Sequence, residues 1–205
     1  MILAGGTDLM VSAPHRRCRP ASSTCGGCRA AAGCAATATP SSSAPAPPGS
    51  RSAAPPRLAH LPILAAAARE IGALQIQARG TIGGTSAPSP VGDSLPVLLA
   101  LDAEIELRGP GGARRVAYAS YCTGYRTTAR AADELIAAVR VPVPSTTTAL
   151  HWRKVGTRRA QSISKVMGAA AIRWDGDVVA EARLALGAVA AQPIRAAGRG
   201  GRGAG

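Results

Sequence analysis

The stretch "RGTIGGTSAPSPVGDSLPVLLALDAEIEL", residues 79–107, decides the fold, because it passes from a glycine-rich turn through an apolar segment to an alternating one. Residues 95–101 are all apolar, which predicts a short buried helix. Residues 103–109 ("AEIELRG") alternate in the manner of a strand. After the turn "GPGG", residues 113–119 ("ARRVAYA") are expected to return as the hairpin partner of that strand.

The glycines and threonines of "GTIGGT", residues 80–85, leave two interpretations open. One is a tight turn between two elements. The other is a cradle in which backbone N–H groups approach the phosphates of a cofactor while threonine adds a hydroxyl donor. The loop "AGGTDL", residues 4–9, has the same design, and neither loop matches a standard phosphate-binding pattern. Each loop alone favours a turn, whereas the two together favour a diphosphate ligand without naming it.

The remaining patterned segments mix helices and strands. Residues 1–11 predict a short strand followed by a Gly-Gly-Thr turn, and residues 61–74 predict a helix that Gly72 ends. Residues 133–144 predict a strand closed by prolines. A helix is expected from Ser162, running into a strand over Ala170–Trp174, and a turn at 175–177 then leads into a strand over 178–189. Because the hairpins come without a regular βαβ repeat, the sequence favours the α+β class.

The formal net charge of +13 does not indicate nucleic-acid binding. Residues 58–194 hold fifteen Lys or Arg against ten Asp or Glu, so the excess lies in residues 12–57 and in the C-terminal tail. The chain has no Phe, and its few aromatic residues do not alternate with basic ones, as a stacking platform for single strands requires. We expect no membrane span, since no apolar run reaches about 18 residues. The N-terminus lacks a signal-peptide pattern, and a cytoplasmic location is the default expectation.

Residues 12–57 are anomalous. They contain no Val, Ile, Leu, Met, Phe, Tyr or Trp, but they hold eight of the sixteen prolines and four of the five cysteines. Such a segment cannot bury enough apolar surface to offset its ordering entropy, so it is expected to be disordered. A metal site at Cys18, Cys25, Cys28 and Cys34 is disfavoured by their irregular spacing. A flexible linker and a pair of compensating frameshifts in a GC-rich gene are the other interpretations, and the composition fits the frameshifts better.

Several segments together carry a resemblance to a known family. They are "LAGGTDLMV" at 3–11, "IGALQIQARGTIGG" at 71–84, "SPVGDSLPVLLALDAEIELRG" at 89–109, "CTGYR" at 122–126, "DELIAAVRVP" at 133–142 and "KVGTRRAQSISKV" at 154–166. In these segments the chain resembles the FAD-binding (medium) subunit of the molybdenum hydroxylases, of the xanthine dehydrogenase and carbon monoxide dehydrogenase type. Thr85 stands where the family usually has Asn.

The resemblance implies a two-lobed α+β FAD-binding domain of the PCMH type over residues 1–148. A small, truncated C-terminal α+β domain with an antiparallel sheet would follow over residues 149–205. It also implies an oxidoreductase subunit without a catalytic acid, base or nucleophile of its own. Electrons would come from a molybdopterin-binding large subunit through a [2Fe–2S] subunit to FAD, and would leave to NAD or another acceptor.

The resemblance assigns cofactor-binding roles to particular residues. Residues Ile2 to Leu9 would wrap the FAD diphosphate, and Thr81 to Thr85 would complete the diphosphate site. Ile71 and Gly72 would flank the flavin or the adenine. Asp93 would accept a hydrogen bond from a ribose or ribityl hydroxyl, Ile136 or its neighbour Leu135 would contact a ring, and Lys154 would lie near the flavin, where positive charge favours the reduced form. The full set is Ile2, Leu3, Ala4, Gly5, Gly6, Thr7, Asp8, Leu9, Ile71, Gly72, Thr81, Ile82, Gly83, Gly84, Thr85, Asp93, Ile136 and Lys154.

Each assignment has a plainer alternative. Asp93 could be the N-cap of the helix that follows it, and Lys154 a solvated surface charge. Arg158 and Arg159 could pair with the acidic strand at 104–106. Cys122 is expected to be a small buried residue. For the whole chain, the alternative is a defective fragment without a cofactor, or a basic protein that binds polyanions.

Overall fold

A computed structural model describes residues 2–3, 23–24, 61–73, 76–77, 82–83, 91–158 and 161–196, the first two pairs as backbone only. The pairs Ile2–Leu3 (β1) and Ser23–Thr24 (β2) form a two-stranded parallel sheet, so the strand expected at the N-terminus is present. All other residues of 1–60, including the four cysteines, lie outside the described part. The expectations for the loop at 4–9 and for the rest of 12–57 therefore stay predictions.

The stretch at 95–117 folds as its pattern predicts. Helix α6 (Leu95–Ala100) is buried throughout, and strands β3 (Glu104–Gly109) and β4 (Gly112–Ala117) form an antiparallel hairpin. Strand β7 (Leu135–Arg140) pairs with the other edge of β3 and completes a three-stranded sheet in the order β4-β3-β7. This strand lies within the segment 133–144 that was expected to be extended.

A short helix after β4 carries two buried tyrosines. Helix α7 (Tyr118–Tyr121) follows β4 directly, and strands β5 (Cys122–Gly124) and β6 (Thr127–Thr128) form a small hairpin after it. Cys122 is half-buried, and its Sγ lies 3.7 Å from the Tyr118 hydroxyl oxygen. Burial raises the pKa of the Cys122 thiol, which disfavours the nucleophilic thiolate and fits the predicted structural role.

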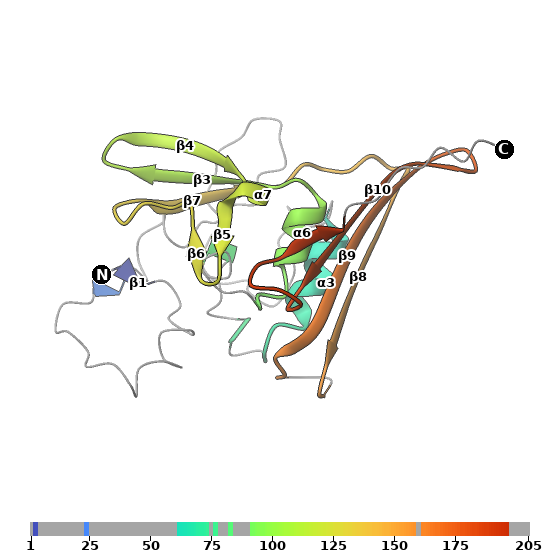
Figure 1. The fold of residues 1–205 in the computed structure, drawn as a ribbon, viewed down its shortest axis with the longest axis horizontal. Coiled ribbons are helices and arrows are strands. Elements are labelled where there is room, and N and C mark those ends of the chain that lie inside the picture. Colours follow the sequence, from blue (N-terminus) through green and yellow to red (C-terminus); the bar gives the residue numbers. More distant parts are fainter. Residues whose placement is uncertain are drawn as a thin grey trace.

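A four-stranded antiparallel sheet forms the C-terminal part of the molecule, in the order β11-β10-β9-β8. Its strands are β8 (Thr148–Gly156), β9 (Ser164–Asp175), β10 (Val178–Gly187) and β11 (Ile194–Ala196). The turn expected at 175–177 joins β9 to β10, with Gly176 at a φ of 58°. Figure 1 shows this sheet at one side of the molecule, with the β4-β3-β7 sheet at the other.

The helix expected from Ser162 is wrong, because the segment from Ser164 onward is the central strand β9. Its run of small residues has the local preference of a helix. The strand instead pairs on both sides with β8 and β10, and Met167, Ala169 and Ala171 are buried at alternate positions. Pairing and burial against the rest of the chain override local propensity here.

Two helices cover the inner face of the four-stranded sheet (Figure 1). Helix α3 (Pro62–Arg69) packs against β8, and α6 packs against β9 and β10. Leu61, Ile63 and Leu64 from α3 and its start join α6 and the sheets in one buried cluster. Helix α3 ends before Glu70, earlier than the expected end at Gly72, although Gly72 does adopt the left-handed φ of 55° that favours glycine.

The end of α6 is held to the sheet by charged side chains. Asp102, just beyond the helix, accepts hydrogen bonds of 2.6 Å from Arg183 on β10 and from Arg195 on β11. Arg195 also donates to the Leu99 carbonyl oxygen. Burial works to raise the pKa of Asp102, but the two arginines outweigh it and the pKa is lowered. No helix in the part of the chain that the structure describes is long and apolar enough to cross a membrane.

Candidate cofactor-binding site

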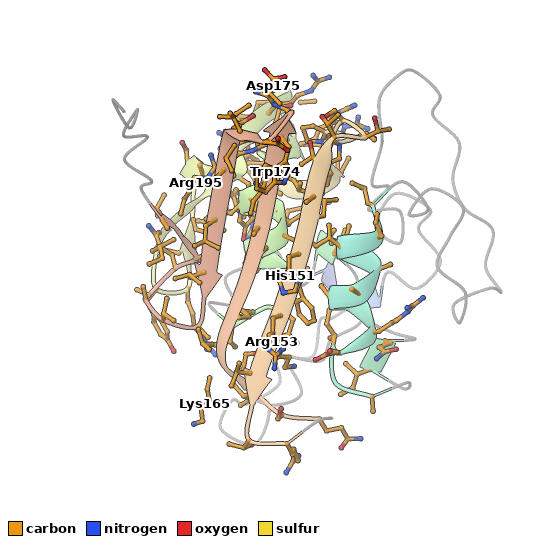
Figure 2. All side chains as sticks on the ribbon, turned by 90° about the vertical axis from the view of Figure 1, so that its right-hand side faces the viewer. His151, Arg153, Lys165, Trp174, Asp175 and Arg195 are labelled. Atoms are coloured by element: carbon orange, nitrogen blue, oxygen red, sulfur yellow. The ribbon has the colours of Figure 1, made fainter. Side chains whose placement is uncertain are left out.

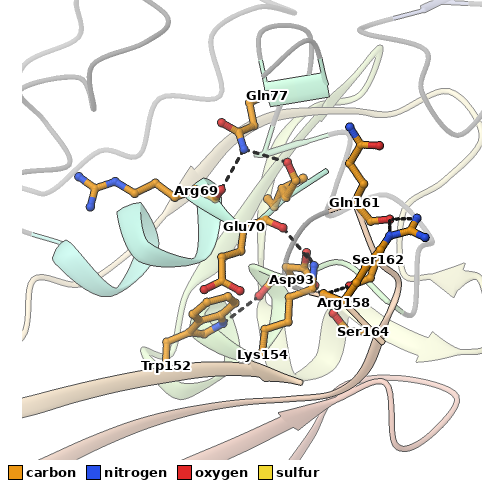
Figure 3. Close-up of polar contacts among 11 residues, drawn as sticks. Arg69, Glu70, Gln77, Asp93, Trp152, Lys154, Arg158, Gln161, Ser162 and Ser164 are labelled. Atoms are coloured by element: carbon orange, nitrogen blue, oxygen red, sulfur yellow. Dashed lines mark hydrogen bonds and ion pairs between the residues drawn. The ribbon is translucent and has the colours of Figure 1, made fainter. Parts of the chain in front are cut away.

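Asp93 lies in the turn that leads into α6, and its side chain is almost completely buried. Ser94, not Asp93, occupies the N-cap position of that helix. The Asp93 carboxylate instead points to the inner face of the four-stranded sheet, where Oδ2 lies 2.7 Å from Lys154 Nζ on β8 (Figure 3). The N-cap alternative for Asp93 is therefore wrong.

Lys154 has a buried side chain rather than a solvated charge. It lies on the inner face of β8, and only 5% of its side chain is exposed. Besides Asp93 Oδ2, its Nζ donates to the Glu70 carbonyl oxygen at 3.1 Å. An ammonium group taken out of water needs such partners, because its desolvation costs several kcal/mol. The ion pair thus joins β8, the turn after α3 and the turn before α6.

Two further residues hold Asp93 in place, and the sequence analysis missed both. Ser164 on β9 donates through Oγ to Asp93 Oδ1 at 2.5 Å, and Trp152 on β8 donates through Nε1 to the Asp93 carbonyl oxygen at 3.2 Å. Trp152 precedes Lys154 by two positions, so strand alternation places both on the same face. That signal could have identified Trp152. Ser164 carried no such signal, because its segment was expected to be helical.

The Asp93–Lys154 cluster retains hydrogen-bonding capacity. A carboxylate has about four lone-pair sites and a lysine ammonium has three N–H donors. Within the described residues, Lys154 uses two of its donors, and each oxygen of Asp93 accepts one bond. The cluster can therefore offer both a charged donor and a charged acceptor to a polar ligand beside it.

The predicted pair Ile71 and Gly72 lies next to this cluster, since Glu70, whose carbonyl oxygen binds Lys154, directly precedes it. Gln77 holds the turn by donating through Nε2 to the carbonyl oxygens of Arg69 and Ile71, at 3.0 and 3.1 Å (Figure 3). A Cβ on Gly72 would lie 2.6 Å from Ile76 Cδ1. The turn at 70–72 therefore requires glycine for both its φ and its space.

The other predicted cofactor-binding residues are either not shown in contact with the Asp93–Lys154 cluster or lie outside the described residues. Ile82 is half-buried and packs against the core, with Gly83 beside it, while Thr81, Gly84 and Thr85 lie outside the described residues. Ile2 and Leu3 form strand β1, and Ala4 to Leu9 lie outside that part as well. Ile136 lies on β7 in the other sheet, opposite Leu107, where it packs against the core; its neighbour Leu135 is exposed. The structure thus brings together Ile71, Gly72, Asp93 and Lys154, but it does not show Ile136 in that cluster.

The alternative that Arg158 and Arg159 pair with the acidic strand at 104–106 is tested only by the partners that the structure shows for Arg158 and Glu106. Arg158 donates to the Gln161 carbonyl oxygen, and Glu106 is bound by Arg140 at 2.6 Å and by Arg108 at 3.3 Å. The hydrogen bond from Arg140, against the effect of burial, lowers the pKa of Glu106. Arg159 lies outside the described residues. Among the residues that the structure describes, no group of three or more His, Cys, Asp or Glu side chains could hold a metal ion.

Comparisons with known proteins match the two parts of the chain separately. The family described as "FAD binding domain in molybdopterin dehydrogenase" matches residues 50–144, and the "CO dehydrogenase flavoprotein C-terminal domain" matches residues 151–199. The carbon monoxide dehydrogenase medium chain of Afipia carboxidovorans is 35% identical over 137 residues, which are 66% of this chain and 47% of that one. The xanthine dehydrogenase FAD-binding subunit of Escherichia coli O157:H7 is 35% identical over 138 residues, with the same two shares.

A solved structure extends the likeness to the fold. The carbon monoxide dehydrogenase of Hydrogenophaga pseudoflava that lacks the Mo-pyranopterin moiety matches 95% of this chain and 69% of its own chain, at 26% identity and a TM-score of 0.79. The chain spans about half the length of the curated relatives it matches. The two family matches follow one another along the chain, with the FAD-binding domain first and the C-terminal domain second. The chain therefore belongs to the molybdenum hydroxylase family of FAD-binding medium subunits, of the carbon monoxide dehydrogenase and xanthine dehydrogenase type.

Proposed function

We propose that this chain binds FAD and serves as the electron-relaying flavin subunit of a molybdenum hydroxylase. The observation that carries the proposal is the buried pair of Asp93 and Lys154 beside the turn at 70–72. Three predicted cofactor-binding elements meet there, although they are far apart in the sequence. The family matches over 50–144 and 151–199 support the same cofactor.

The residues of the cluster fit FAD in their chemistry. FAD presents ribityl and ribose hydroxyls, a diphosphate and a polar flavin edge, all of which need hydrogen-bonding partners in a buried site. The remaining N–H donor of Lys154 suits an acceptor atom, and the remaining lone pairs of Asp93 suit a hydroxyl. The glycine turn at Gly72 lets a ligand approach the backbone closely. When bound, FAD supplies the capacity to take up and release electrons.

The chain's own residues then bind and orient the cofactor. Ser164 and Lys154 bind the two oxygens of the Asp93 carboxylate and so orient it, while Trp152 holds the backbone carbonyl of Asp93. Lys154 keeps a positive charge in a site from which water is largely excluded, where electrostatic interactions are stronger than in water. Residues Ala4 to Leu9 and Thr81 to Thr85 would hold the diphosphate, and Ile136 would contact a ring.

The domain division and the partners belong to the same proposal. The FAD-binding domain would comprise residues 1–148 and the small C-terminal domain residues 149–205; the separate sheets β4-β3-β7 and β11-β10-β9-β8 support this division. Relatives named as medium chains imply assemblies with other subunits. We infer a [2Fe–2S] subunit as electron donor, a molybdopterin-binding large subunit, and NAD or another acceptor.

A cofactor-binding experiment on the full chain tests the proposal. The purified protein is expected to carry, or to take up from added FAD, a stoichiometric flavin with its visible absorption band and quenched fluorescence. Lys154→Met should weaken FAD binding at least about tenfold. Lys165→Met is a matched control, since Lys165 is the exposed lysine of the adjacent strand, and it should bind FAD as the wild type does.

Circular dichroism of each variant separates lost binding from lost folding. A folded wild-type chain that takes up no flavin at any accessible concentration would contradict the proposal. A colourless chain that instead binds DNA in a salt-dependent manner would support the alternative of a basic polyanion-binding protein.

A further inference from the structure

Two aspartates flank helix α6, and the four-stranded sheet binds both of them. Asp93 lies shortly before the helix, and Asp102 lies just beyond it. Lys154 on β8 binds the Asp93 carboxylate at 2.7 Å. At the other end, Arg183 on β10 and Arg195 on β11 each bind the Asp102 carboxylate at 2.6 Å. Polar contacts therefore hold the helix to the sheet at both of its ends.

The contacts at the two ends of α6 come from different parts of the sheet. Strand β8, which binds the Asp93 end, is one edge of the sheet, and β11 is the opposite edge. Figure 2 looks onto the sheet and shows Arg195 at the side away from His151 and Arg153, the labelled residues of β8. A helix of six residues is only about 9 Å long, so α6 links these two sets of contacts over a short distance.

Helix α6 is able to transmit a displacement from one end to the other. All of its residues are buried, and it packs against β9, β10 and β11. The packing is tight, because a Cβ on Gly187 of β10 would lie 2.8 Å from Pro96 Cγ. Close-packed elements deform little and transmit strain. A change in how Asp102 is held should therefore shift the helix and, with it, the position of Asp93.

The two ends of α6 differ in how far they are removed from water. The Asp93 and Lys154 side chains are almost fully buried, whereas 49% of the Asp102 side chain is exposed. In a buried ion pair the loss of hydration offsets much of the attraction, so the Asp93–Lys154 pair by itself contributes little to holding the helix. The Asp102 carboxylate keeps part of its hydration, and Arg195 also donates to the Leu99 carbonyl oxygen. The Asp102 end therefore holds α6 independently of any cofactor.

We propose that Asp102 is a positioning residue of the FAD site and acts on Asp93 through helix α6. The inference rests on the proposed function. With Asp102 bound by its arginines, the helix keeps the place at which Asp93 meets Lys154, Ser164 and Trp152. The remaining lone pairs of Asp93 then have a fixed position toward the cofactor. FAD and the Asp102 contacts favour the same placement of α6, so weakening one weakens the other.

The fluorescence of Trp152 tests the link between the two ends without any cofactor. The chain has two tryptophans, so a Trp174→Phe background leaves Trp152 as the single reporter. Its indole Nε1 donates to the Asp93 carbonyl oxygen. In this background Asp102→Asn should shift the Trp152 emission to longer wavelength, because the half-buried indole loses a fixed partner. Asparagine tolerates the φ of 51° at position 102, so the turn itself is kept.

Glu181→Gln is the matched control for Asp102→Asn. Glu181 also binds Arg183, at 3.2 Å, but it lies on β10 and not beside α6. Its removal takes one carboxylate from the same arginine and leaves the helix held. The control should therefore keep the Trp152 emission of the background protein. An equal shift in both variants would contradict an action through α6.

FAD titration of the full chain is the second test. Asp102→Asn should raise the FAD dissociation constant at least about fivefold, which is the lower end of typical coupling between separate sites. Arg195→Met leaves Arg183 in place and should give a smaller change of the same sign. It keeps the proposal testable if Asp102→Asn does not fold. Glu181→Gln should bind FAD as the wild type does, and circular dichroism confirms that each variant is folded.

The outcomes separate this inference from the proposed function. If the wild type binds FAD and the folded Asp102 and Arg195 variants bind it equally tightly, the positioning role is overturned and the proposed function stands. Weaker FAD binding with an unchanged Trp152 emission also overturns it, because the effect then does not pass through α6. A folded wild-type chain that takes up no FAD overturns both.

Discussion

Lys154 and Asp93 form an ion pair that is almost completely buried, although 61 residues separate them in the sequence. The Nζ–Oδ2 distance is 2.7 Å, and the two side chains are 5% and 9% exposed. The pair joins the turn before α6 to strand β8, and therefore joins the segment that carries the glycine motifs to the C-terminal sheet. Because both side chains are buried, each charge would be left unpaired and out of water if the other were removed.

Removing one partner of this pair should destabilise the fold severely. Lys154→Met or Asp93→Asn leaves the other group without its charged partner, which typically costs about 3–5 kcal/mol. Urea unfolding followed by circular dichroism measures the loss. The double variant Asp93→Asn/Lys154→Met should lose clearly less than the sum of the two single losses. Additive losses would show that the two charges do not depend on each other.

The Ser164 hydroxyl is expected to stabilise the folded state through Asp93. Ser164→Ala removes the donor to Asp93 Oδ1 in a buried place, where a lost hydrogen bond costs about 1–3 kcal/mol. Ser162→Ala is the matched control, because the Ser162 hydroxyl donates to the Arg158 carbonyl oxygen at an exposed site. The free energies of unfolding from urea titrations should separate the two variants. Equal losses would contradict a special role for Ser164.

A contact between α6 and the sheet depends on Gly187. A Cβ at this position on β10 would lie 2.8 Å from Pro96 Cγ and 3.0 Å from Met167 Cε. Gly187→Ala should therefore overpack the interface between helix and sheet and cost about 1–3 kcal/mol. At Gly111 a Cβ meets nothing within 4 Å, so Gly111→Ala should be nearly neutral. A thermal melt of both variants distinguishes them, and a Gly187→Ala protein as stable as Gly111→Ala would refute the close contact.

Acid should weaken the fold partly through Glu134. The Arg114 guanidinium, which donates at 2.6 and 2.8 Å, and then the Ala131 N–H hold the pKa of Glu134 at about 2, below its ordinary 4.5. Because the folded-state pKa is the lower one, the stabilisation is fully present above pH 4.5 and is lost as the pH falls toward 2.

Glu134→Gln should abolish that part of the pH dependence. Unfolding measured at several pH values is expected to show a stability difference between wild type and variant that shrinks from pH 4.5 to 2. Arg114→Met should remove the same dependence, because it removes the main cause of the lowered pKa. A difference that stays constant over this range would contradict the assignment to Glu134.

Local patterns predicted helix α6 and strands β3, β4, β7 and β10, but they did not predict β8, which carries Lys154. The alternation at 103–109 and the turn at 109–112 are strong short-range signals, and β3, β4, β7 and β10 lie where such signals occur. The second half of β9 agrees with the strand expected over Ala170–Trp174, but its first half was expected to be helical, because pairing on both edges and burial of alternate residues leave no local pattern. Only its neighbours in space make it a strand.

The candidate site was predictable as separate residues but not as a cluster. Asp93, Lys154 and the turn at 71–72 were each singled out, yet the direct contact between Asp93 and Lys154 was not expected. Nor was the support from Ser164 and Trp152, since a hydrogen bond between residues 71 or 59 positions apart leaves no local pattern.

The sequence by itself determined the class of the fold, the family, and the types of residue available to a cofactor, because turn chemistry, apolar periodicity and motif order are written locally. Only the tertiary structure decided which charges are buried, which residues hold them, and which sheet face the helices cover. Burial and pairing depend on segments that are distant in the chain. Because an unpaired buried charge is costly, buried groups of opposite charge from such segments lie in contact with each other.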